Sequence, residues 1–99
     1  MKPRITCICG STRFVDVMAV EAWKLEKQGI IAIGPHLLPQ WYEGVKEHHQ
    51  AEAEGMAGIL DELHLRKIDL SDEVLVINVG GYIGDRTRAE IGYAEQHRK

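Results

Sequence analysis

Short runs of β-forming residues alternate along this chain with longer stretches of helical periodicity, and this alternation limits the folds open to it. The run from Arg4 to Cys9 predicts a strand, because it is rich in β-formers and leads into a turn at Gly10. From Thr12 to about Gln28 the apolar residues follow a helical period, and Gly29 supplies the stop. The almost continuously apolar run from Ile30 to Ile33 predicts a strand buried on both faces. This order predicts a right-handed βαβ unit.

The alternation continues in the second half of the chain. We predict a helix from Met56 to about Leu70, a strand from Glu73 to Asn78 and a helix from about Asp85 to Gln96. Residues 34–54 show no clean periodicity, and a loop of this length suggests a lid or a specificity loop, with a helix starting as early as Ala51. We therefore expect residues 1–99 to form a single α/β domain. It would have an open parallel sheet of three or four strands flanked by helices, flavodoxin-like or Rossmann-like.

Charge and composition exclude several classes of function. The formal net charge of −3 lacks the basic excess that duplex nucleic acid requires, so no such partner is expected. No apolar run approaches the ~20 residues that cross a bilayer, so no membrane partner is expected either. The first ten residues show no export signal, which favours a cytoplasmic location.

The two cysteines of the chain, Cys7 and Cys9, lie two positions apart on the first predicted strand. Their side chains face the same side of the strand but cannot easily form a disulfide with each other. A reduced, buried pair is therefore favoured over a metal or redox site. The spacing of His48, His49 and Glu52 is only loosely typical of metal ligands, so we expect a solvated loop there. We expect no metal and no other cofactor.

Three loops follow the carboxyl ends of the predicted strands, where open parallel sheets bind ligands: residues 9–13, 34–36 and 78–82. The first loop opens a helix, whose unpaired amides and dipole favour a phosphate or a carboxylate; an ordinary capped turn is the alternative. The candidate binding residues come from this loop, from the third loop and from the start of the last helix. They are Gly10, Ser11, Thr12, Arg13, Gly80, Gly81, Tyr82, Asp85 and Arg88.

Glu90, in the last predicted helix, has two interpretations. It lies three residues after Thr87, which matches a Thr-x-x-Glu capping box that closes the start of the helix. A carboxylate held at a helix N-terminus would also stay ionised and oriented, as a covalent nucleophile must be. His64 is likewise either a packed histidine on one stripe with Leu60 and Ile68 or a functional group.

Three segments resemble the nucleoside 2-deoxyribosyltransferase superfamily, whose members include deoxynucleoside 5′-monophosphate N-glycosidases. The segments are Ile8 to Arg13, Asp72 to Gly84 and Arg88 to Ala94. The most specific parts are the Gly-Ser-x-Arg turn and the Glu-Ile-Gly-Tyr-Ala helix. The resemblance covers nearly all the predicted elements and leaves residues 35–55 unmatched.

The resemblance implies roles for particular residues. In that superfamily the matching glutamate attacks the anomeric carbon of the deoxyribose, which implies that Glu90 is the nucleophile. The matching first turn holds the 5′ end of the sugar or its phosphate, which implicates Gly10, Ser11 and Arg13. The implied ligand is therefore a nucleoside or a nucleotide.

Family enzymes also carry a second acid that assists the leaving base. The nearest candidates in this chain are His64 and Asp61, with Asp69 close by, and none of them is a secure match. Family members assemble as oligomers whose neighbours complete the site, so the resemblance also implies a homodimer or a larger homo-oligomer.

Three functions follow from these observations. The first is cleavage or transfer of the N-glycosidic bond of a deoxynucleoside or its 5′-monophosphate, through a glycosyl-enzyme intermediate. The second is a non-catalytic nucleotide-binding module that acts as a sensor or sequesters its ligand. The third is partner binding through the aromatic pair Trp41 and Tyr42.

Overall fold

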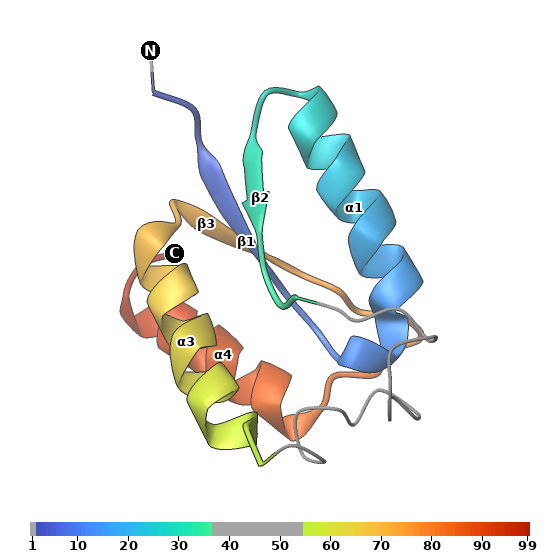
Figure 1. Ribbon diagram of the computed structural model, residues 1–99, viewed down its shortest axis with the longest axis vertical. Helices are drawn as coiled ribbons and strands as arrows, with labels where there is room; N and C mark the ends of the chain where they lie inside the picture. Colours follow the sequence, from blue (N-terminus) through green and yellow to red (C-terminus); the bar gives the residue numbers. More distant parts are fainter. Residues whose placement is uncertain (1, 37–54) are drawn as a thin grey trace.

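The computed structural model describes residues 2–36 and 55–99, in which strands and helices alternate (Figure 1). The elements in chain order are β1 (Ile5–Cys9), the 3-10 helix η1 (Thr12–Phe14), α1 (Val15–Lys27), β2 (Ile31–Ile33), α3 (Ala57–Leu70), β3 (Glu73–Val76) and α4 (Asp85–Gln96). The three strands and three α-helices were expected from the sequence, and most of their bounds differ from the prediction by one or two residues. The helix predicted from Thr12 is instead divided into η1 and α1, which begins at Val15. Most of the predicted loop lies outside the described residues, together with its possible helix from Ala51, the Trp41–Tyr42 pair and the group His48, His49 and Glu52.

Within the described chain, the strands form one open parallel sheet in the order β2-β1-β3. Ile5 of β1 pairs with Ile31 of β2, and Cys9 of β1 pairs with Val76 of β3. The predicted α/β architecture with an open parallel sheet is therefore confirmed. The order is that of the first three strands of a flavodoxin-like sheet, in which the first strand is central.

β2 lies at one edge of this sheet, and its burial differs from the prediction. The near-continuous apolar run suggested a strand covered on both faces, but Ile31 is 40% exposed. The prediction is wrong at this residue because an edge strand has a neighbour on one side only.

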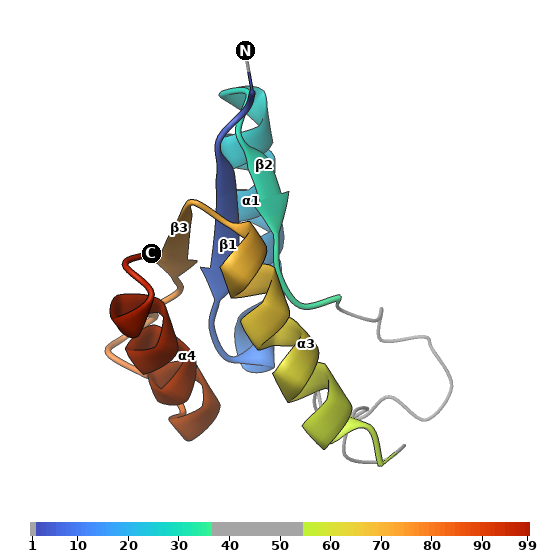
Figure 2. The same ribbon diagram turned by 90° about the vertical axis from the view of Figure 1, so that its left-hand side faces the viewer.

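Helices cover both faces of the sheet. α1 lies on one face and α3 and α4 lie together on the other (Figures 1 and 2). β1 supplies side chains to both faces, because successive residues of a strand point in opposite directions. Ile8 packs with Met18 and Ile77 on the α1 face, whereas Cys7 and Cys9 pack on the face of α3 and α4.

The apolar stripe predicted along α3 is buried only in its second half. His64 and Ile68 are buried, but Ile59, Leu60 and Leu63 are about half exposed. The first half of α3 extends past the carboxyl ends of the strands, so its apolar residues have no sheet to pack against (Figure 2). No helix in residues 2–36 and 55–99 has both the length and the apolar character to cross a bilayer.

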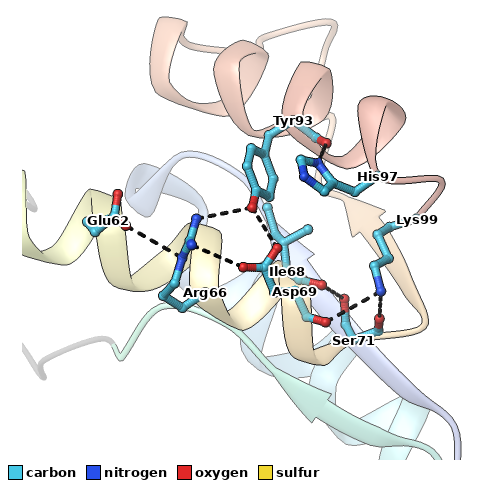
Figure 3. A network of polar contacts seen from close by, with 8 residues as sticks. All are labelled: Glu62, Arg66, Ile68, Asp69, Ser71, Tyr93, His97 and Lys99. Carbon is cyan, nitrogen blue, oxygen red and sulfur yellow. Dashed lines mark hydrogen bonds and ion pairs between the residues drawn. The ribbon is translucent and has the colours of Figure 1, made fainter.

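A polar network joins α3 to α4 (Figure 3). The hydroxyl of Tyr93 donates to Asp69 over 2.6 Å and accepts from Arg66 over 3.1 Å. Arg66 also pairs with Glu62 and with Asp69, which are ion pairs of the kind expected on an exposed helix face. Lys99 adds a hydrogen bond of 2.8 Å to the carbonyl of Ser71, just after α3. These contacts fix the two helices whose inner faces carry His64 and Glu90.

Candidate functional site

The candidate site lies at the carboxyl ends of β1 and β3. The chain leaves β1 toward β2 on one side, and β3 occupies the other side, so the strand order reverses at this point. Open parallel sheets bind ligands in the crevice at such a reversal. The first and third predicted loops, residues 9–13 and 78–82, border this position.

The first loop is ordered by a side-chain cap. Ser11 has extended backbone angles, and its Oγ accepts a hydrogen bond of 3.3 Å from the amide of Arg13. Thr12 then begins η1. Gly10 is required by packing, because a Cβ there would lie 2.8 Å from the Cβ of Ile77 and 3.0 Å from Cε of Met18.

The first and third loops are in direct contact. The guanidinium carbon of Arg13 lies 4.1 Å from the ring centroid of Tyr82, a cation–π arrangement. Phe14 meets the same ring edge-on, with 5.8 Å between centroids. The expected convergence of these two loops is therefore present, and it brings a cation, a capped turn and an aromatic ring together.

The third loop is a tight glycine turn. Gly80 and Gly81 both have positive φ, at 60° and 80°, a conformation in which side chains with a Cβ are strained. The amide of Tyr82 donates to the carbonyl of Val79 over 3.0 Å and closes the turn. The two glycines therefore set the direction in which the Tyr82 ring leaves the backbone.

A buried polar cluster lies on the face of β1 that α3 and α4 cover, toward the carboxyl end of the strand. It consists of Cys7 and Cys9 of β1, His64 of α3 and Glu90 of α4. Nε2 of His64 lies 3.8 Å from Sγ of Cys7, 3.4 Å from Sγ of Cys9 and 3.4 Å from Oε1 of Glu90. Both cysteines are fully buried and unbridged, as predicted, whereas the side chain of Glu90 keeps 15% of its surface exposed.

The cluster shifts the protonation of its members. Burial raises the pKa of Glu90 to about 7, against the opposing effect of His64. Burial acts to lower the pKa of His64, but the hydrogen bond with Cys7 and the charge of Glu90 outweigh it, and the net shift is upward. A hydrogen bond from Cys9 lowers the pKa of Cys7, and the same bond together with burial raises that of Cys9. The cluster therefore holds one thiol that ionises readily beside an imidazole.

Glu90 does not belong to a capping box. α4 begins at Asp85 with Gly84 as its N-cap, and no side chain caps it. Thr87 is the third residue of the helix and is 3% exposed, so its hydroxyl is not at the cap position. The Thr-x-x-Glu interpretation is wrong, because the helix begins at Asp85, three residues earlier than that motif requires. Glu90 instead lies in the second turn, near Cys9 and His64. The expectation that a helix N-terminus keeps Glu90 ionised is therefore also wrong, because burial raises its pKa.

The other predicted site residues lie in three places. Asp61 is one turn before His64, and its carboxylate lies 3.5 Å from Nε of Arg86, with half of its side chain exposed. Its charge also acts to raise the pKa of Glu90, so it borders the cluster. Asp85 is the exposed first residue of α4.

Arg88 lies on another face of α4. Two helical positions differ by about 200° in direction, so Arg88 points away from Glu90. With Ile83, Ile91, Gly92 and Glu95 it lines a shallow hollow of about 260 Å³. Arg88 is therefore not brought to the polar cluster.

Sequence reasoning did not include the two cysteines among the site residues. The signal that could have found them is the alternation of β1, which sends both thiols to one face. The second signal is helical spacing, because His64 lies four residues before the buried Ile68 and Glu90 lies four residues before the buried Ala94. Both helices thus direct a polar group and an apolar residue at β1.

Comparison of the chain with protein-family models, with curated proteins and with solved structures found no match. The resemblance to the nucleoside 2-deoxyribosyltransferase superfamily therefore stays an expectation from sequence motifs.

Proposed function

We propose that this chain cleaves or transfers the N-glycosidic bond of a 2′-deoxynucleoside or its 5′-monophosphate, with Glu90 as the nucleophile. The observation that carries the proposal is the environment of Glu90. Its carboxylate is largely buried, lies 3.4 Å from Nε2 of His64 and adjoins the strand that leads into the Ser11 turn. A helix-capping role, the main competing explanation, does not fit the position of Glu90 in α4.

The first half of the reaction forms a covalent ester. An oxygen of the ionised Glu90 attacks C1′ of the deoxyribose, and the bond from C1′ to the base nitrogen breaks. The base leaves with the bonding electron pair and takes up a proton. A poorly hydrated carboxylate suits this step, because little water has to be removed before attack.

The second half releases the sugar. Water attacks C1′ of the ester, transfers a proton to the medium or to a neighbouring base and returns Glu90 as a carboxylate, which gives hydrolysis. A second nucleobase that attacks through a ring nitrogen gives transfer instead. The same nucleophile serves both outcomes, and the acceptor decides between them.

Two side chains next to Glu90 are suited to protonating the leaving base. His64 is the closer, and its raised pKa favours the protonated imidazolium that can act as an acid. Asp61 lies one turn earlier on α3 and is half exposed, nearer to the position of a base that projects from the crevice. We propose His64 as the proton donor and Asp61 as a contact for the base.

The first loop is suited to the 5′ end of the sugar. Its amides at the start of η1 and the cation of Arg13 favour a phosphate or a hydroxyl. Stacking on Tyr82 holds the guanidinium in place before a ligand arrives, which lowers the entropic cost of binding.

A second function is favoured by one specific observation. The contact between Arg13 and Tyr82 forms an anion-binding feature that does not depend on Glu90. A module that binds a nucleotide without turnover would use this feature alone. Nucleotide binding and base release therefore have to be measured separately.

The decisive experiment incubates the protein with 2′-deoxynucleosides and their 5′-monophosphates and measures free base by chromatography. We expect Glu90→Gln to reduce base release by about 100-fold or more, because the amide cannot form the ester. Intact-protein mass spectrometry of the native chain, quenched during turnover, should show one added deoxyribosyl or deoxyribosyl phosphate group.

The matched control is Glu95→Gln, which removes an exposed carboxylate from the same helix. It should leave base release unchanged. Base release by Glu90→Gln at the native rate would refute the nucleophile. Absence of base release, with thermal stabilisation by monophosphates that Arg13→Ala abolishes and Glu90→Gln retains, would establish the binding module instead.

A further inference from the structure

Three side chains of the buried polar cluster present metal-ligating atoms to one another from two different elements. Sγ of Cys7, Sγ of Cys9 and a ring nitrogen of His64 all lie within 4.8 Å of one another. Cys7 and Cys9 reach this point because alternate residues of β1 share a face, and His64 reaches it from the buried side of α3. The proposed reaction does not use the two thiols.

The spacing of these atoms matches the edges of a tetrahedral coordination shell. Zinc bonds of ~2.3 Å to sulfur and ~2.0–2.1 Å to nitrogen, at a tetrahedral angle, separate sulfur from nitrogen by about 3.6 Å. The observed separations from Nε2 of His64 are 3.8 Å to Cys7 and 3.4 Å to Cys9, one on each side of that value. The two sulfur–nitrogen separations therefore fit a tetrahedral zinc site to within a few tenths of an ångström, and the two sulfurs lie within 4.8 Å of each other.

Hydrogen bonding accounts poorly for the same arrangement. Three partners, the two sulfurs and Oε1 of Glu90, lie around the single atom Nε2 of His64, which can carry one proton and direct it at one acceptor. The separation of 3.4 Å between His64 and Glu90 is also longer than the ~2.7–2.9 Å of a charge-assisted hydrogen bond. A cation placed among these atoms would satisfy all of them at once.

The donor set selects the kind of cation. Two thiolates and an imidazole are soft or borderline ligands, which suit zinc rather than magnesium or calcium. Two sulfurs and one nitrogen leave a fourth position open, and Oε1 of Glu90 lies 3.4 Å from Nε2 of His64.

We propose that Cys7, Cys9 and His64 bind one thiophilic divalent cation of the zinc class, with Glu90 beside its fourth coordination position. Binding needs two thiolates and a neutral imidazole, so each proton that these three groups still carry passes to the solvent when the ion binds. The proposal goes beyond the proposed function and does not rest on it, since its test needs no nucleotide. A cation bound to Nε2 of His64 leaves that nitrogen without a proton, so the proton-donor role proposed for His64 belongs to the metal-free protein.

The test titrates the full chain, purified in reducing buffer without metal, with Co²⁺ and then with Zn²⁺. We expect one equivalent of Co²⁺ to produce the visible bands of a tetrahedral site and a thiolate-to-cobalt charge-transfer band, and Zn²⁺ to remove both. X-ray absorption of the zinc form should show two sulfur neighbours at ~2.3 Å together with nitrogen or oxygen. A shell of nitrogen and oxygen alone would overturn the proposal.

Variants assign the ligands. Cys7→Ala, Cys9→Ala and His64→Asn should each weaken zinc binding by at least about 100-fold, since even groups outside the coordination shell contribute 10–100-fold. The control is the double variant His48→Gln with His49→Gln, which removes two adjacent histidines outside the proposed site and should leave the affinity for zinc unchanged. Circular dichroism of each variant without metal shows whether it folds, and the absorption experiment on the native chain decides the proposal if one does not.

Two results would refute the site directly. The first is the absence of a charge-transfer band when Co²⁺ is added to the native chain. The second is native affinity for zinc in the folded Cys9→Ala variant. Loss of base release in Glu90→Gln has no bearing on either result, so this proposal and the proposed function can fail separately.

Discussion

The two faces of β1 differ in chemistry although one five-residue strand supplies both. Toward α1, Ile8 packs with Met18 and Ile77 in an ordinary apolar core. Toward α3 and α4, Cys7 and Cys9 meet an imidazole and a carboxylate. The first face stabilises the fold by removing apolar surface from water. The second face combines apolar contacts of Cys7 and Cys9 with Ile68 and Ala94 with ionisable groups whose burial is costly, so we expect it to stabilise the fold less.

The largest expected effect is on the apolar face. Ile8→Ala should lower the free energy of unfolding by about 2–5 kcal/mol, because it removes buried methyl groups and leaves a cavity. Urea denaturation followed by circular dichroism measures the change. Ile8→Val is the graded control and should cost about 0.5–1.5 kcal/mol. A loss below about 1 kcal/mol for Ile8→Ala would show that this face is not the main source of stability.

The polar face should respond in the opposite direction. Replacing His64 and Glu90 together by leucine should leave the unfolding free energy unchanged or raise it by about 1–4 kcal/mol, because two buried polar groups no longer lose their hydration. The same denaturation experiment applies, with the single His64→Leu variant for comparison. A double variant less stable than Ile8→Ala would mean that the polar cluster is itself a structural support.

Gly10 tests how closely the apolar face approaches the first loop. Gly10→Ala should destabilise the protein by about 1–3 kcal/mol, because the new Cβ would lie 2.8 Å from the Cβ of Ile77, an atom that cannot move far from its backbone. Gly92→Ala on α4 is the matched control. It meets nothing within 4 Å and should raise helix stability by up to about 1 kcal/mol. Equal melting temperatures for the two variants would contradict this account.

The smallest effect concerns the support of the polar face. Tyr93→Phe removes the hydroxyl that joins Asp69 to Arg66 and should lower the melting temperature only slightly, since these hydrogen bonds are exposed to water. The ring contact with His97, at 4.0 Å between centroids, remains possible for phenylalanine. Thermal unfolding of the variant and of the native chain measures the difference. An unchanged melting temperature would show that this network does not fix α3 against α4.

Local patterns were sufficient for much of the fold. The bounds of α4 were predicted from Asp85 to Gln96 and agree with the structure, because the loop glycines and the helical period mark both ends. The prediction failed where tertiary packing overrides local pattern. The apolar residues Ile59 and Leu63 of α3 fit the helical stripe, yet the short sheet leaves them half exposed.

The candidate site was predictable in part. The sequence indicated the first and third loops, since Gly10 follows a strand and Gly80 follows another, and these loops do meet through Arg13 and Tyr82. It could not indicate the meeting of Cys9, His64 and Glu90, because that depends on three elements packing at one level of the sheet. The capping-box prediction failed for a related reason, since the Thr-x-x-Glu spacing is present but α4 begins at Asp85, before Thr87.

The register of β1 with its two neighbours has a consequence for the order of folding. Ile5 meets Ile31 of β2 across a chain separation of 26 positions, whereas Thr6 meets Glu73 of β3 across 67. Closing the longer loop costs about 0.8 kcal/mol more in chain entropy, which favours early formation of the half that contains α1. The face of β1 that carries Cys7 and Cys9 is then covered last, so we expect both thiols to stay open to solvent, and to any oxidant in it, until α3 and α4 dock.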